Sequence, residues 1–103
     1  MKILVVCGAG ASSTFVALRM RKTAESRGLK VTITAGTESD LAFGLAGVDV
    51  LLIGPHLAGL YDDVREHANQ AGIGVVLLPT TIFAARDGEE ALDLALDAAG
   101  ARP

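Results

Sequence analysis

The sequence is short of several residue types, and each shortage excludes a class of protein. Its 103 residues include one cysteine, no tryptophan and few aromatic residues, and nine basic residues stand against twelve acidic ones. A single cysteine cannot form an intramolecular disulfide, so the fold is not held by disulfide bonds. The formal net charge of −3 and the lack of stacking side chains argue against binding to nucleic acid or to an anionic membrane surface.

Long hydrophobic runs are also absent. No stretch approaches the about 20 apolar residues that a membrane-spanning helix needs, which argues against direct membrane insertion. The apolar run at residues 3–6 is too short for the hydrophobic part of a secretory signal. The length suits one domain, which buries roughly 60–70% of the surface of its unfolded chain. We therefore expect a single domain over residues 1–103, located in the cytoplasm.

Apolar runs rich in β-forming residues alternate with helix-like stretches along the chain. Strands are expected at residues 2–6, 30–35, 48–53 and 73–78, and helices at 13–27, 38–46, 57–71 and 89–99. The runs "KILVV", "DVLLI" and "GVVLL" suit strands that are covered on both faces, whereas "KVTITA" alternates and suits a sheet edge. Gly28, Gly72 and Gly100 follow helical stretches, as C-terminal caps do. The pattern predicts an α/β fold with a four-stranded parallel sheet of order 2-1-3-4 and helices on both faces.

A sheet of this order has a crevice at the carboxyl ends of its first and third strands, where neighbouring connections run to opposite faces. The loops at that crevice are "CGAGASS" and "GPHLAG". The only thiol of the chain, Cys7, therefore stands where α/β proteins of this kind bind their ligands.

Cys7 also stands just before a helix start, where N–H groups and the helix dipole favour an anion. We therefore expect its thiol pKa to lie below that of a free cysteine. The loop that follows combines small residues, which let the backbone approach an anion closely, with hydroxyl donors: Gly8, Ala9, Gly10, Ala11, Ser12, Ser13 and Thr14. We predict that it holds a tetrahedral dianion against the sulfur. The alternative is that Cys7 is only a small buried hydrophobic residue.

Other interpretations of this loop can be tested by comparing its sequence with known motifs. Gly8 and Gly10 fit the dinucleotide-binding pattern G-x-G-x-x-G/A, but Ser13 stands in the place of its last glycine. A low-molecular-weight cysteine phosphatase or an arsenate reductase would carry C-x5-R, and here Ser13 replaces the arginine that clamps the phosphoryl oxygens. Asp87 is the residue that could serve as the general acid of that reaction. A non-catalytic module that binds anions or senses oxidants is a third alternative, although a sensor would benefit from a second cysteine.

The segments "VVCGAGASSTFVALRMR" and "DVLLIGPHLAG" resemble the IIB component of the lactose/cellobiose class of the bacterial sugar phosphotransferase system, over essentially the whole chain. The resemblance implies a phosphoryl carrier. Cys7 and the two histidines do not have the spacing of metal ligands, so we expect neither a metal nor a cofactor. In that family the cysteine that matches Cys7 takes a phosphoryl group from a histidine of the IIA partner and passes it to a sugar held by the membrane component IIC. A loop without arginine suits a carrier, which must release its phosphoryl group.

Two further features have both a functional and a structural interpretation. His56 lies in the loop after the third strand, where it could assist an incoming phosphoryl group or have no role. On the first helix, four residues fall on one arc that should face the sheet: Val16, Met20, Thr23 and Ala24. Leu18 should point away from the sheet among basic residues, and Phe15 should be partly in the core. We predict that Phe15, Leu18 and Arg19 help to dock IIA, against the alternative of a solvated helix face.

Overall fold

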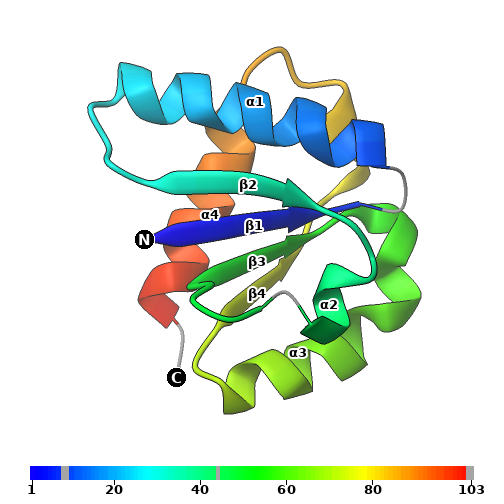
Figure 1. The fold of residues 1–103 in the computed structure, drawn as a ribbon. Coiled ribbons are helices and arrows are strands. Elements are labelled where there is room, and N and C mark those ends of the chain that lie inside the picture. The colour runs from blue at the N-terminus through cyan, green and yellow to red at the C-terminus, as the bar shows by residue number, and fades with distance from the viewer. Residues whose placement is uncertain (8–9, 44, 102–103) are drawn as a thin grey trace.

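The computed structural model describes residues 1–7, 10–43 and 45–101. For residues 10–12, 42, 43 and 101 it describes the backbone only. Four strands alternate with helices in this part of the chain (Figure 1). The strands are β1 (Lys2–Val6), β2 (Thr32–Gly36), β3 (Val50–Ile53) and β4 (Gly74–Leu77). The α-helices are α1 (Gly10–Ser26), α2 (Asp40–Phe43), α3 (Tyr61–Gln70) and α4 (Glu89–Ala101), and two 3-10 helices are η1 (Pro55–Leu60) and η2 (Thr80–Phe83).

The four strands form one parallel sheet in the order β2-β1-β3-β4, which confirms the predicted topology. In its register, Ile3 of β1 is paired with Ile33 of β2 on one side and with Val50 of β3 on the other. All four residues of β3 are buried, as expected for an apolar strand covered on both faces. In β2, exposed and buried positions are mixed, as expected for a strand at the sheet edge.

Helices cover both faces of the sheet (Figure 1). α1 and α4 lie on one face, where Met20 and Leu92 share a hydrophobic cluster with Val5 and Leu52 of the sheet. On the other face, Ala68 of α3 packs in a second cluster with sheet residues such as Leu51. The expectation that one sheet is buried between two helical layers is confirmed, and the carboxyl ends of all four strands lie along one edge.

The helices differ from the sequence prediction in several places. The helix expected at residues 57–71 is divided into η1, which begins earlier at Pro55, and α3, which begins at Tyr61. Within η1, Leu57 has non-helical φ −105° and ψ 21°. The helix expected at 38–46 is reduced to the four residues of α2, and η2 was not predicted. Gly28 and Gly72 have φ of +70° and +76°, which confirms them as left-handed residues after helices. Gly100 lies inside α4 instead, because the helix continues through it to Ala101.

No helix in the described part of the chain is long and apolar enough to cross a membrane.

Candidate functional site

Cys7 lies at the carboxyl end of β1, beside the end of β3. The two strand ends are joined by a hydrogen bond of 2.7 Å from the Gly54 N–H to the Val6 carbonyl. Gly54 approaches Cys7 so closely that an added Cβ would lie 2.9 Å from the cysteine Sγ. The expectation that the loops after the first and third strands meet at Cys7 is therefore confirmed.

The thiol itself is enclosed. Cys7 is 1% exposed and belongs to the hydrophobic cluster under α1 and α4, together with Val5 and Val16. This burial raises the pKa of the Cys7 thiol above its ordinary value, because the thiolate loses water that the apolar surroundings do not replace. The expectation of a lowered pKa is therefore wrong: burial raises the pKa of Cys7 and favours the protonated thiol.

A helix does begin close to Cys7. The first residue of α1 is Gly10, three residues after the cysteine, which is earlier than the start at residue 13 that the sequence predicted. The free N–H groups of a first helical turn favour an anion. Gly8 and Ala9, and the side chains of Ala11 and Ser12, lie outside the described residues, so the predicted anion loop remains a prediction at those positions.

Ser13, at the position of the phosphatase arginine, points into the protein. It is 1% exposed, and its hydroxyl donates a hydrogen bond of 3.2 Å to the carbonyl of Gly36 at the end of β2. This bond joins the first turns of α1 to the edge strand. Thr14, the next residue, is exposed.

His56 is exposed in η1 at the same edge of the sheet. Its ring stacks on that of Phe83 in η2, with the ring centroids 5.5 Å apart and the planes inclined by 12°. The stack connects the segment after β3 with the segment after β4. The sequence prediction identified His56 but missed Phe83, because nothing in "PTTIFAARDG" indicated a helical turn there.

The outer face of α1 is as predicted at Leu18 but not at Phe15. The four residues expected to face the sheet are buried: Val16, Met20, Thr23 and Ala24. Leu18 is 43% exposed, which confirms that it points outward. Phe15 is 61% exposed, so the expectation that it is partly in the core is wrong. It stands three residues before Leu18, and residues with this spacing lie on the same side of a helix.

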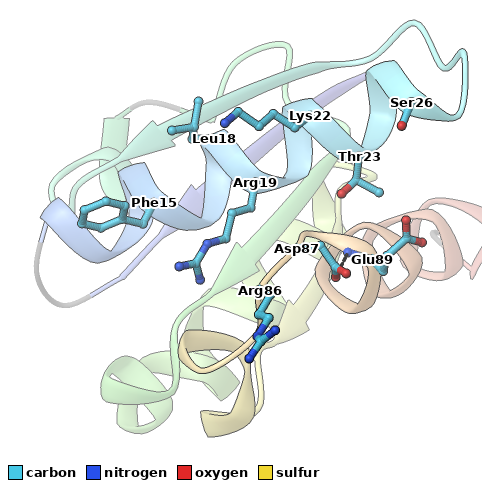
Figure 2. Close-up of a pocket in the computed structure, with 9 residues that line it drawn as sticks. All are labelled: Phe15, Leu18, Arg19, Lys22, Thr23, Ser26, Arg86, Asp87 and Glu89. Atoms are coloured by element: carbon cyan, nitrogen blue, oxygen red, sulfur yellow. Dashed lines mark hydrogen bonds between the residues drawn. The ribbon is translucent and has the colours of Figure 1, made fainter.

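A groove of about 400 Å³ separates α1 from the segment that leads into α4 (Figure 2). One wall is α1, with Phe15, Leu18 and Lys22, and the other includes Arg86. Figure 2 shows Arg19 pointing from α1 toward this second wall, where its guanidinium donates a hydrogen bond of 2.6 Å to the carbonyl of Ala85. The sequence prediction missed this wall, although the small residue at Gly88 was a signal of close packing.

No cluster of three or more His, Cys, Asp or Glu side chains within residues 1–7, 10–43 and 45–101 is arranged to hold a metal ion.

Comparison with known proteins identifies the family. Residues 2–94 match the family described as "PTS system, Lactose/Cellobiose specific IIB subunit". The chain is 28% identical to the oligo-beta-mannoside-specific EIIB component of Bacillus subtilis, with 92% of each chain covered. It is 30% identical to the cellobiose-specific EIIB component of Lactococcus lactis subsp. lactis, with 87% of this chain and 88% of that one covered.

A solved structure supports the same relationship. The cellobiose-specific IIB component from Borrelia burgdorferi superposes with a TM-score of 0.78 at 31% identity, covering 99% of this chain and 94% of the other. The chain therefore belongs to the lactose/cellobiose-specific IIB subunits of the sugar phosphotransferase system.

Proposed function

We propose that Cys7 carries a phosphoryl group from a histidine of a IIA protein to a sugar bound by a membrane IIC component, in the cytoplasm. The observation that carries this proposal is the position of the thiol. Cys7 stands where β1 and β3 end side by side, three residues before the first residue of α1. A nucleophile at that point can receive a tetrahedral anion at a helix N-terminus.

Burial raises the pKa of Cys7, so the thiol brings its proton into this reaction. Sγ attacks the phosphorus, the P–N bond to the histidine breaks, and the thiol proton ends on the nitrogen that leaves. In the second step a sugar hydroxyl attacks the phosphorus, the S–P bond breaks, and the hydroxyl proton passes to Sγ. Because burial favours the protonated thiol, the resting cysteine is less reactive toward oxidants and alkylating reagents than a thiolate would be.

We propose that the phosphoryl oxygens are held by neutral donors of the loop and of the first turn of α1: Gly8, Ala9, Gly10, Ala11, Ser12 and Thr14. Neutral donors hold the group less firmly than a bidentate arginine would, which suits a carrier that must release it. Ser13 has a different part in this proposal. Its hydroxyl proton is directed at the Gly36 carbonyl, so Ser13 braces the loop against β2.

For His56 we propose an accessory contact with the incoming phosphoryl group. Its exposed ring is held by Phe83, and ring nitrogens remain at the edge of the stack to donate a hydrogen bond. The test is His56→Phe, which keeps an aromatic ring for stacking and removes the donor. Slower transfer with an unchanged melting temperature supports the contact, and transfer at the wild-type rate contradicts it.

The proposed function is tested with phosphoenolpyruvate, the general phosphotransferase proteins and a panel of lactose/cellobiose-class IIA proteins. We expect wild-type protein to gain one phosphoryl group with the acid, base and iodine lability of a thiophosphate. Cys7→Ser should gain none, because a serine hydroxyl is a far poorer nucleophile at neutral pH. Labelling of Cys7→Ser would overturn the assignment. Rapid release of inorganic phosphate without a sugar acceptor would favour the phosphatase alternative.

A further inference from the structure

The groove between α1 and the segment before α4 carries an exposed apolar surface. The large hydrophobic residues that are exposed among the described side chains are Met1, Phe15, Leu18 and Leu29. Two of these four, Phe15 and Leu18, line the groove one helical turn apart. Scattered exposed hydrophobic residues are normal, but a pair in one groove is a surface that a partner can cover.

The charges in the groove are predominantly unpaired cations. Lys22 and Arg86 both line it, and within the described part of the chain neither makes an ion pair or a side-chain hydrogen bond. Of the two acids at its rim, only Glu89 is paired with a cation among the described residues, while Asp87 keeps its charge and is outnumbered by the lining cations Arg19, Lys22 and Arg86. Glu89 is paired with Arg27, and Asp87 accepts a hydrogen bond of 3.1 Å from the Glu89 N–H. The groove therefore presents positive charge on a protein whose formal net charge is −3.

The two walls of the groove are held in a fixed relation. The Arg19 guanidinium bonds to the Ala85 carbonyl at 2.6 Å, and the Gly88 N–H donates to the Thr23 hydroxyl at 3.1 Å. These bonds join α1 to the segment that carries Arg86. A partner would therefore meet a surface that is already shaped, which reduces the ordering cost of binding.

We propose that this groove docks an acidic, partly apolar face of the IIA donor, with Phe15 and Leu18 as the apolar contacts and Lys22 and Arg86 as the charged ones. This inference rests on the proposed function. It extends the docking face expected on α1 by a second wall, and it makes Arg19 a residue that shapes the groove. α1 begins three residues after Cys7, and Phe15 lies in its second turn, so a protein seated at that end of the groove is close to the thiol.

The charge of the groove favours IIA over the other partner. The cytoplasmic loops of membrane proteins carry an excess of lysine and arginine, and such loops of IIC would be repelled by Lys22 and Arg86. Small interfaces with an apolar centre and a polar rim are typical of transient complexes, as a carrier that exchanges partners requires.

The first test measures phosphoryl acceptance against the concentration of the IIA protein that phosphorylates wild type fastest in the panel. In the double variant Lys22→Glu/Arg86→Glu we expect the IIA concentration at half-maximal rate to rise about tenfold at low salt, with little change in the maximal rate. The matched control is Lys30→Glu/Arg65→Glu, which makes the same charge change at exposed residues outside the groove. Equal effects in both double variants overturn the proposal, since they would report net charge alone.

The second test measures binding without transfer, by titrating isotope-labelled Cys7→Ser with unphosphorylated IIA and following its amide resonances. We expect shifts at Phe15, Leu18 and Arg86, and we expect Leu18→Asp to weaken binding several-fold more than Leu29→Asp, the control at another exposed leucine. Shifts confined to other surfaces, or no binding, overturn the proposal. Groove-dependent binding without phosphorylation of Cys7 in wild-type protein would instead overturn the proposed function and leave the docking site standing.

A vesicle assay separates a protein partner from a membrane. Wild-type protein should not sediment with phosphatidylglycerol vesicles at physiological salt. Sedimentation that Lys22→Glu/Arg86→Glu abolishes, together with an unchanged dependence on IIA concentration, would identify the groove as a lipid-binding surface and overturn the proposal.

Discussion

Gly54 packs directly against Cys7, so a side chain at position 54 would press on the cysteine where the two strands end. A Cβ on Gly54 would lie 2.9 Å from the cysteine Sγ and 3.0 Å from its Cα and Cβ. Carbon atoms in proteins pack favourably at about 3.5–4.0 Å, so each of these contacts would be a clash. The location of the thiol therefore depends on a glycine in the neighbouring loop, 47 positions along the chain.

Gly54→Ala is expected to displace Cys7 and to lower the free energy of unfolding by about 1–3 kcal/mol, the usual cost of overpacking. Phosphoryl acceptance should fall as well, because the new methyl group lies against the nucleophile. Urea denaturation and the transfer assay measure the two effects. The control is Gly59→Ala in η1, where an added Cβ meets no atom within 4 Å. Similar behaviour of the two variants would contradict the role given to Gly54.

Cys7 should react with iodoacetamide only at alkaline pH. Its folded-state pKa is raised by burial, so the rate should titrate above the value of a free cysteine measured in the same buffer. The free energy of unfolding should also depend on pH through the Cys7 thiol. The native thiol keeps its proton at pH values where the unfolded one, with a pKa of about 8.5, has lost it.

Because the folded-state pKa of Cys7 is raised, stability should decrease as the pH rises. The contribution of the protonated thiol is fully present below the unfolded pKa and is lost as the pH rises through the folded pKa. Wild-type protein should therefore lose stability relative to Cys7→Ser above about pH 8.5 and show a constant difference below it. An alkylation profile that titrates below free cysteine would mean that the N–H groups of the loop outweigh burial.

Ser13 is expected to matter for stability more than for chemistry. Its buried hydroxyl bonds to Gly36, and Ser13→Ala should lower the free energy of unfolding by about 1–2 kcal/mol while transfer stays within threefold of wild type. Ser13→Arg, which would complete the phosphatase pattern, must instead bury a guanidinium and should unfold the protein. A stable Ser13→Arg variant with phosphatase activity would show that the loop rearranges.

The sequence was sufficient to predict the sheet. The apolar runs of β1 and β3 and the alternation in β2 follow from period and burial alone, and their order brings Cys7 and Gly54 together. Two features could not be obtained in this way. The pKa direction of Cys7 depends on how many apolar neighbours enclose it, and the wall at Arg86 depends on a segment without periodicity. Both are consequences of tertiary packing between distant segments.

Gly88 packs against α1 and joins the two walls of the groove. A Cβ on Gly88 would lie 2.5 Å from the N and Cα of Met20, and these backbone atoms of α1 cannot move aside as a flexible side chain would. Gly88→Ala should therefore separate the two walls, weaken the bond to Thr23 and lower the free energy of unfolding by about 3 kcal/mol. Gly100→Ala is the opposite case, because no atom lies within 4 Å of its Cβ and it is inside α4.

Alanine has the higher helix propensity, so Gly100→Ala should stabilise the protein by up to about 1 kcal/mol. The two variants together separate stability from docking. At a temperature where Gly88→Ala remains folded, it should need more IIA for half-maximal transfer than wild type, because the wall that carries Arg86 is then displaced from α1. Gly100→Ala should need the same amount as wild type. If Gly88→Ala lost stability but kept the wild-type dependence on IIA, the segment before α4 would support the fold without forming a wall of the docking surface.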